Sequence, residues 1–287
     1  MSKRFRDILL RIGLYAVVIL ICVWVIAPFA WLVISSISTR IQLTSVPLDW
    51  FPDQPNFDHY RRVFFGGQGA TSMHRNLNGA AVNTLIVAGM STLISLVAGS
   101  MAAYAFTRLR FRLKGSLLVT ILITQLLPTV SIIIPMYRIM LTLDLLDTIW
   151  GLVLANVTII LPMIIWILRG YFAGLPEGLE EAARIDGCTR IGTIVRIMLP
   201  LSAPGLAASG MFAFIVAWNE FFTAFILSST MNSKTLSVVI SEFSSKVGID
   251  YVAMATAGVL ASIPPVVLAI VFQRYIVQGL TAGAVKG

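Results

Sequence analysis

Residues 174–200 read GLPEGLEEAARIDGCTRIGTIVRIMLP, and this stretch is the one polar, charge-dense island between long apolar runs. Pro176 suits a first helical turn, the carboxylates that follow it lie near the positive end of the helix dipole, and Gly187 stands where a left-handed C-terminal cap is needed. Beyond it, Thr189 can cap a second helix, which Pro200 would end. The pattern therefore predicts a compact helical hairpin over residues 174–200.

The charge of this hairpin indicates what it meets. Between Arg169 and Pro200, four basic side chains balance four acidic ones. A helix that lies on anionic lipid should instead be basic. Two interpretations remain: a helical loop that only connects two membrane spans, or a docking element in which Ala182 and Ala183 permit close approach and the carboxylates pair with a basic groove of a partner protein.

A family resemblance favours the docking element. The residues that carry it are Glu181, Ala182, Ala183, Gly187, Ile197, Leu199 and Pro200. Their types and spacing resemble the EAA loop of ABC importer permeases, a coupling helix that sits in a cleft of a cytoplasmic ATPase. The resemblance implies that Glu181, Ala182, Ala183 and Gly187 form the contact core and that Gly187 is needed for the turn.

The whole chain is far more apolar than a soluble domain. Of its 287 residues, 57% are hydrophobic and 12% charged, and the mean hydropathy is +0.89, which indicates a polytopic membrane protein. The net charge of +8 is spread over loops beside the apolar runs, so no nucleic-acid partner is expected. Cys22 and Cys188 imply no disulfide framework, and His59 and His74 have no cysteine nearby, so no metal site is expected.

Six apolar runs can each cross a bilayer, which needs about 20 apolar residues. The predicted spans cover about residues 12–35, 79–107, 116–137, 148–168, 201–227 and 252–273. Residues 1–11 form a cytoplasmic N-terminus, and residues 12–287 form a single transmembrane domain. The basic loop from Arg108 to Lys114 is cytoplasmic by the positive-inside rule, which places both termini in the cytoplasm. A signal peptide is the competing interpretation of the first run, but that run is too long and lacks a convincing cleavage site.

Prolines and loops add detail to this all-α topology. Pro128 and Pro135 predict a broken third span, and Pro264-Pro265 predict a break in the last one. The loop at residues 138–147 should be short and external. Residues 40–75 should form a longer external connection, either an ordered cap at the membrane interface or a plain connector.

Glu220 is the only acidic residue inside an apolar run, where an acid costs on the order of 3 kcal/mol on insertion scales. Trp218 and Asn219 beside it add an aromatic face and an amide, groups that suit a sugar ring and its hydroxyls. Trp218, Asn219 and Glu220 are thus candidate residues of a substrate pathway. The alternative is a partly solvated residue near the external mouth. The Trp-Asn-Glu-Phe sequence resembles the fifth span of carbohydrate permeases.

The C-terminal segment carries a second resemblance. Its candidate residues are Gly279, Leu280, Thr281, Ala282, Gly283 and Lys286. Most terminal segments of this composition are frayed. This one, however, resembles the tail of the smaller permease subunits of the maltose/trehalose-type family, which reaches into the ATPase dimer. Residues 104–111 and 143–148 also resemble that family.

The resemblance implies the type I ABC importer permease fold and the import of a disaccharide or oligosaccharide by ATP-driven alternating access. No lysine follows a glycine, so no Walker A motif is present. We expect no enzymatic activity and no bound cofactor in this chain, with ATP and Mg used by a partner ATPase. The implied partners are a second homologous permease, two copies of the ATPase, an extracytoplasmic sugar-binding protein and the lipid of a prokaryotic inner membrane.

Two alternatives stay open. An ABC permease could carry a non-sugar solute such as glycerol phosphate or a polyamine, although predicted spans without Lys or Arg favour a neutral solute. A proton-coupled secondary transporter would use Glu220 as its titrating carboxylate. A single intramembrane acid without a basic partner argues against that mechanism.

Overall fold

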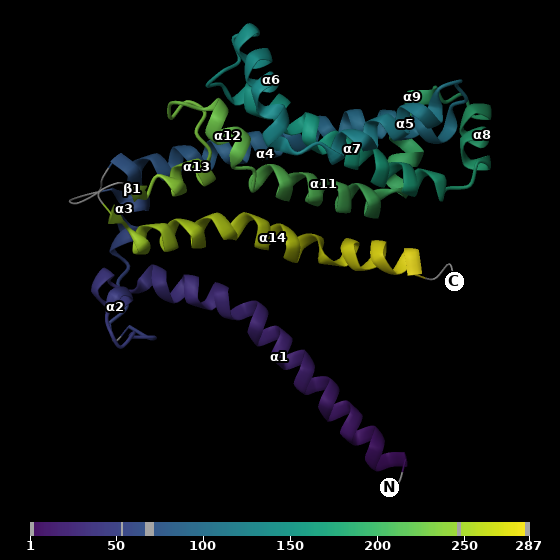
Figure 1. Ribbon diagram of the computed structural model, residues 1–287. Helices are drawn as coiled ribbons and strands as arrows, with labels where there is room; N and C mark the ends of the chain where they lie inside the picture. Colours follow the sequence, from purple (N-terminus) through teal and green to yellow (C-terminus); the bar gives the residue numbers. More distant parts are fainter. Residues whose placement is uncertain (1–2, 53, 67–71, 246–247, 285–287) are drawn as a thin grey trace. The chain divides into compact units, whose positions relative to one another are not determined.

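The computed structural model describes residues 3–52, 54–66, 72–245 and 248–284, and most of these are helical (Figure 1). Their contacts divide the chain into two compact units. The first is Met1–Leu77 with Ile240–Ser262, and the second is Asn78–Val239 with Ile263–Gly287. The expectation of one domain over residues 12–287 did not include this division.

The first unit is built on the C-terminal end of a long apolar helix. Its elements are α1 (Lys3–Ile37), α2 (Arg40–Thr44), α3 (Asp58–Phe65), the antiparallel pair β1 (Ser244–Ser245) and β2 (Gly248–Ile249), and the first turns of α14 (Tyr251–Ala284). Ser36 joins three of them, since its hydroxyl accepts a hydrogen bond from Tyr60 (2.8 Å) and its carbonyl accepts one from Thr256 (3.3 Å). The connection after α1 therefore contains ordered helices, as a cap would.

The second unit is built around a central helix, α7. Its elements are most of α4 (Ser72–Arg108), α5 (Lys114–Ile123), η1 (Thr124–Leu126), α6 (Thr129–Thr142), α7 (Ile149–Ala173), α8 (Gly178–Ile185), α9 (Arg190–Thr193), η2 (Ile194–Met198), α10 (Leu199–Leu201), α11 (Ala203–Trp218), α12 (Phe222–Leu227), part of α13 (Leu236–Ser241) and the rest of α14. Leu152, Ile160, Ile164, Leu168 and Phe172 of α7 are almost completely buried. The core of this unit thus follows one helix.

Small residues let other helices approach α7 closely. A Cβ added to Gly99 of α4 would lie 2.6 Å from Cγ2 of Ile164, and one added to Gly205 of α11 would lie 2.4 Å from Cγ of Tyr171. Both distances are shorter than any tolerable carbon–carbon contact. Glycine at these positions is therefore part of the packing.

Four helical segments of the described chain are long and apolar enough to cross a membrane: Leu10–Ile37, Asn76–Arg108, Ile149–Ala173 and Tyr251–Tyr275. Two bent helix pairs pass the same test together, Lys114–Leu126 with Thr129–Thr142 (103°) and Arg190–Leu201 with Ala203–Trp218 (86°). Counting each pair as one span gives six candidates, which is the predicted number.

Three details of the predicted topology are wrong. Arg138 lies inside α6, which runs on to Thr142, so the loop after it is shorter than expected. α14 continues through Pro264 and Pro265 without a break, because the fixed φ of proline fits a helix even though its missing N–H removes a hydrogen bond. The predicted span over 201–227 is divided, since α11 ends at Trp218 and α12 begins at Phe222.

Candidate functional site

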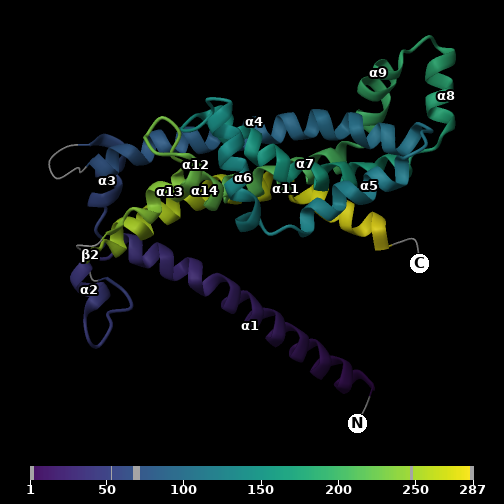
Figure 2. The ribbon, with the colours of Figure 1, turned by 45° about the horizontal axis from the view of Figure 1, so that its top comes forward.

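The predicted hairpin is present in the second unit, where α8 and α9 lie together at one end (Figure 2). Gly187 has φ +83°, the left-handed conformation that its position predicts. The N–H of Gly187 donates to Arg184 O and that of Cys188 to Ala183 O, so α8 ends in a Schellman motif. Thr189 caps α9 by accepting a hydrogen bond from the Gly192 N–H at 3.1 Å. The turn between the two helices is therefore closed by its own backbone.

The expected contact core is divided between the surface and the interior. Glu181, Ala182 and Gly187 are exposed, and no atom lies within 4 Å of the Cβ position of Gly187. Ala183, in contrast, is only 3% exposed. This side chain packs inside the chain, which leaves Glu181, Ala182 and Gly187 as the exposed members of the expected contact core. The exposed apolar residue Ile185, at 86%, lies on the outer side of α8 instead.

The second helix of the hairpin differs from its prediction. Leu199 N–H donates to Ile194 O, five residues back, and residues 194–198 form a π-helix. Pro200 does not end the helix, which continues to Leu201 and then bends into α11. Pro200 has no N–H and therefore makes no helical hydrogen bond to the turn before it. That turn can take the wider π-helical form without breaking a hydrogen bond from residue 200. Pro200 is exposed, and Ile197 and Leu199 are half-buried.

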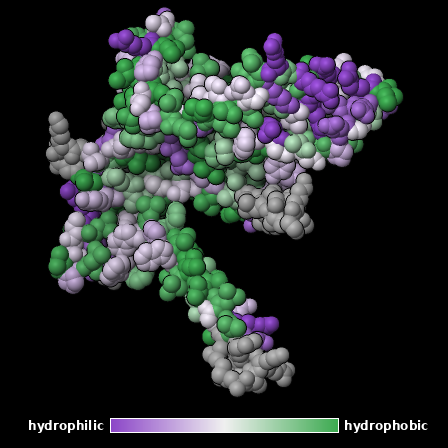
Figure 3. All heavy atoms as spheres, turned by 45° about the vertical axis from the view of Figure 1, so that its right-hand side comes forward, coloured by the Kyte–Doolittle hydropathy of each residue, from purple (hydrophilic) through white to green (hydrophobic). Residues whose placement is uncertain are grey.

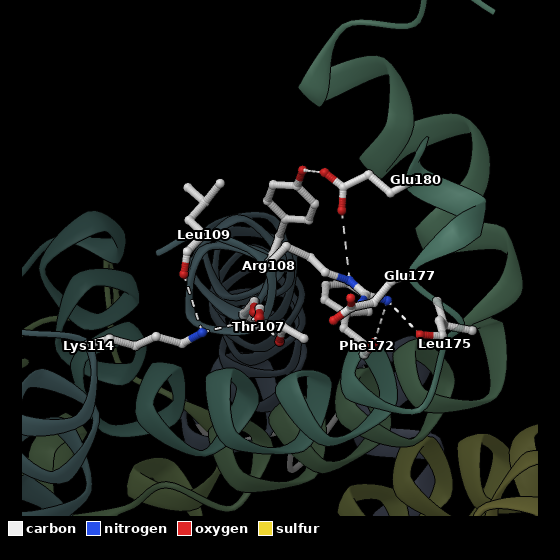
Figure 4. Close-up of polar contacts among 10 residues, drawn as sticks. Thr107, Arg108, Leu109, Lys114, Phe172, Leu175, Glu177 and Glu180 are labelled. Atoms are coloured by element: carbon white, nitrogen blue, oxygen red, sulfur yellow. Dashed lines mark hydrogen bonds and ion pairs between the residues drawn. The ribbon is translucent and has the colours of Figure 1, made fainter. Parts of the chain in front are cut away.

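A buried arginine joins the hairpin to the helices beneath it (Figure 4). The side chain of Arg108, the last residue of α4, is 8% exposed. Its Nη2 donates to the carbonyls of Phe172 (3.2 Å) and Leu175 (2.7 Å), at and beyond the C-terminal end of α7. Its Nη1 lies 3.7 Å from Glu177, and its Nε lies 3.8 Å from Glu180 of α8.

Two more contacts complete this junction. The hydroxyl of Tyr104, one turn before Arg108 on α4, donates a short hydrogen bond to Glu180. Lys114 Nζ donates to the carbonyls of Thr107 (3.1 Å) and Leu109 (3.3 Å), which caps the end of α4. From the sequence, Arg108 is only one basic residue of a cytoplasmic loop. The sequence feature that could have pointed to Arg108 is its position one helical turn after Tyr104, within the stretch 104–111.

Hydrophilic side chains gather at the end of the second unit that carries the hairpin (Figure 3). The basic residues there include Arg184, Arg190 and Arg196, all exposed, and the acidic ones include Glu181 and Asp186. The apolar side chains of Ile191 (61% exposed) and Val195 (56%) project among them. This end of the second unit thus exposes apolar side chains beside charged ones.

The three candidate pathway residues each have a partner within the chain. Trp218 is 6% exposed and stacks on Phe214 at a ring distance of 5.5 Å, so its ring offers no face to a sugar in this structure. Asn219 is exposed, and its amide donates to Ile215 O at 2.9 Å. The Glu220 carboxylate accepts the N–H groups of Thr223 (2.7 Å) and Ala224 (3.0 Å), which caps α12.

A cavity that the sequence does not predict lies beside the bend between η1 and α6. Its volume is about 460 Å³, and mostly apolar side chains line it together with Thr124, Gln125, Thr129 and Thr158. The Gln125 amide donates to Ile159 O at 3.0 Å, which holds the bend against α7. Pro128 forms this bend, as its position predicts.

The C-terminal candidates lie in the last turns of α14. Residues 279–283 belong to this helix, which runs to Ala284, and Lys286 lies outside the described residues. No group of three or more His, Cys, Asp or Glu that could hold a metal ion is found among residues that the structure describes.

The candidate spans and the exposed polar hairpin between two of them fit a component of a membrane transport system. Residues 95–282 match the family described as "Binding-protein-dependent transport system inner membrane component", and the chain belongs to that family. It is 35% identical to the trehalose/maltose transport system permease protein MalG of Thermococcus litoralis, over 98% of this chain and 99% of that protein. It is 34% identical to the sulfoquinovosyl glycerol transport system permease protein SmoH of Agrobacterium fabrum, over 91% and 88%.

A solved structure has the same fold. A chain of a bacterial ABC transporter involved in the import of the acidic polysaccharide alginate matches with a TM-score of 0.78 and 21% identity, over 96% of this chain and 98% of that chain. The type I importer permease fold is thus confirmed. The chain is an inner-membrane permease component.

Proposed function

We propose that this chain is a translocating subunit of an ATP-binding-cassette importer that moves a carbohydrate, a disaccharide or an oligosaccharide, into the cytoplasm by alternating access. The whole-length similarity to a trehalose/maltose permease is the observation that carries this proposal. The exposed hairpin supplies further support, because an ATP-driven permease without a nucleotide site of its own needs a surface for its ATPase.

The hairpin at 174–200 is that surface in our proposal. Glu181, Ala182 and Gly187 meet the ATPase directly, and the Schellman turn holds α8 and α9 together so that they move as one piece. Closure of the ATPase dimer then displaces the hairpin and shifts the spans from inward-open to outward-open. ATP and Mg are bound by the ATPase, and the tail at 279–286 reaches into the ATPase dimer.

The assembly in this proposal contains a second homologous permease, two ATPase copies and an extracytoplasmic binding protein. Both termini and the hairpin are then cytoplasmic, and the connection at residues 40–75 is external. Of the candidate pathway residues, Asn219 and Glu220 stay in the proposal, because their side chains are not buried.

The proposed solute is inferred from the solutes in the names of related permeases, not from the charge of the candidate spans. Arg138 lies within α6, so the third candidate span contains a basic residue, and a neutral solute no longer follows from spans without charge. The names of the two relatives describe one pair of neutral disaccharides and one anionic glycoside. A glycoside is the chemistry that these solutes share.

Purification from the native membrane in mild detergent, with mass spectrometry of the co-purifying proteins, tests the assembly. We expect a Walker-motif ATPase and a second permease. ATP hydrolysis by that complex, with its binding protein, should then rise with a particular glycoside and stay at the basal rate with glycerol phosphate or a polyamine. Recovery of this chain alone, under conditions that keep known complexes intact, would overturn the importer.

Substitution of Glu220 separates the importer from a proton-coupled transporter. Its carboxylate accepts hydrogen bonds from two backbone N–H groups, so Glu220→Gln should lower thermal stability slightly, and the uptake that remains should still depend on ATP. Uptake that survives ATP depletion, collapses with the proton gradient and disappears in Glu220→Gln would establish the secondary transporter instead.

A further inference from the structure

The guanidinium of Arg108 holds α7 and α8 with unequal contacts. The hydrogen bonds to the carbonyls of Leu175, beyond α7, and Phe172, in its last turn, are 2.7 and 3.2 Å long, whereas the contacts with Glu177 and Glu180 are 3.7 and 3.8 Å. Nε of Arg108 is buried and makes no hydrogen bond in the described structure, although it faces the Glu180 carboxylate (Figure 4). A buried donor without a partner is costly, so a shift of α8 towards Arg108 would be favourable.

The covalent attachment of α8 includes two points of backbone freedom. Gly174 and Gly178 flank the short linker between α7 and α8, and no atom lies within 4 Å of a Cβ at Gly178. Glycine gives such a linker more backbone freedom than any other residue. Side-chain contacts with Tyr104 and Arg108 join α8 to the ends of α4 and α7, and Ala183 of α8 is buried.

We propose that Tyr104, Arg108 and Glu180 form a latch that makes α8 move together with α4 and α7. Tyr104 and Arg108 are positioning residues: they act on the partner ATPase only through α8. The inference rests on the proposed function, since it names how the displacement of the hairpin reaches the spans. Without the latch, bending at the glycine linker would absorb that displacement.

Distances between spin labels test the latch in the purified native complex. One label is attached to Cys188 at the hairpin turn and one to a Met101→Cys substitution on α4, with Cys22→Ser removing the other cysteine. In the latched protein the distance distribution should be narrow and the same with and without ATP and vanadate. Tyr104→Phe and Glu180→Gln should each broaden the distribution at least about twofold, and Arg108→Lys should do the same because lysine lacks the planar fork that reaches four groups at once.

Matched controls separate the latch from a general loss of structure. Tyr137→Phe removes an equivalent hydroxyl on α6, and Glu177→Gln removes a carboxylate that is 90% exposed, so both should keep the narrow distribution. The double variant Tyr104→Phe/Glu180→Gln should be no broader than Glu180→Gln alone, because the hydroxyl that Tyr104→Phe removes contacts only the Glu180 side chain that is already changed.

Two outcomes would overturn the latch: distributions of the latch variants that superimpose on the wild type, or equal broadening in the controls. A lower melting temperature or assembly yield with an unchanged distribution would mean that these residues only stabilise the fold. The test is independent of the importer proposal, because the width measured without nucleotide reports on the latch even if no ATPase co-purifies.

Discussion

At the residue scale, Asp147 shows how one side chain orders a loop between candidate spans. Its carboxylate accepts the N–H groups of Ser229 (2.9 Å) and Thr230 (3.0 Å) and the hydroxyls of Thr230 (2.6 Å) and Ser233 (2.7 Å). Desolvation by burial alone would raise the pKa of Asp147, but these hydrogen bonds outweigh it and lower the pKa well below its usual value. The charged form is therefore the one that the fold stabilises.

Asp147→Asn should destabilise the protein by about 1–3 kcal/mol, since it removes the charge from these hydrogen bonds. Asparagine tolerates the positive φ of 55° at this position, so backbone strain is not added. Because the pKa is lower in the folded state, the stabilisation is present above the unfolded value of 3.8 and is lost as the pH falls below it.

Thermal unfolding in detergent at pH 7 and at pH 3 measures how much the Asp147 carboxylate stabilises the protein at each pH. The melting difference between wild type and Asp147→Asn should be largest at pH 7 and shrink at pH 3. Asp144→Asn is the matched control, because Asp144 has a φ of 54° and lies exposed. An equal loss in both variants would show that the hydrogen bonds are not the cause.

Glycine is needed at position 187 because of its backbone conformation, not because a larger side chain would clash. Valine at φ +83° costs about 1–2 kcal/mol, although a Cβ would meet no atom within 4 Å. Gly187→Val should therefore distort the turn and leave ATP hydrolysis without matching uptake, while Gly187→Asn, which tolerates this conformation, should stay coupled. The ratio of solute taken up to ATP hydrolysed is the measurement, and wild-type uptake by an assembled Gly187→Val complex would disprove the role of the turn.

At the element scale, α7 acts as the packing centre because neighbouring helices place glycine against it. Gly205 lies over the ring of Tyr171, where an added Cβ would be 2.4 Å from Cγ of the ring. The ring of Tyr171 on α7 occupies the space that a side chain at position 205 of α11 would need. A densely packed interior leaves no other space for either group. The relative position of α7 and α11 should therefore be sensitive to a single methyl group.

Gly205→Ala should lower stability by about 1–3 kcal/mol, since the ring of Tyr171 must move. Gly170→Ala is the control on the facing helix, because no atom lies within 4 Å of its Cβ position and alanine favours a helix by about 1 kcal/mol. The measurement is the melting temperature of Gly205→Ala and of Gly170→Ala in the same detergent. A Gly205→Ala protein as stable as Gly170→Ala would contradict the close packing.

At the scale of the whole molecule, the two cysteines report on orientation. Cys188 lies in the hairpin and Cys22 in the apolar helix α1. If the hairpin is cytoplasmic, a membrane-impermeant maleimide should label Cys188 in inside-out vesicles and not in intact cells, and it should label better after the ATPase is stripped off. Cys188→Ser should abolish the signal, since lipid excludes the reagent from Cys22. Labelling of Cys188 in intact cells would reverse the proposed topology.

Local features of the fold could be predicted from residues close together in the chain. The left-handed turn at Gly187 and the cap at Thr189 follow from the conformations and donors that these residues offer to their own neighbours. The bend at Pro128 is of the same kind. The apolar runs likewise identified the candidate spans, because helix length and hydropathy are properties of a continuous stretch.

Where a residue type is compatible with two local structures, the sequence alone could not choose between them. Proline permits a helix to continue as well as to break, and α14 continues through Pro264 and Pro265. Alanine in a helix can face a partner or the interior, and Ala183 faces the interior. The sequence by itself determined the membrane class, the helical segments and the hairpin, because short-range sterics and hydropathy specify them. Only the tertiary structure decided which distant groups meet, as Arg108 meets Leu175 and Glu180, because such pairing depends on how whole helices pack.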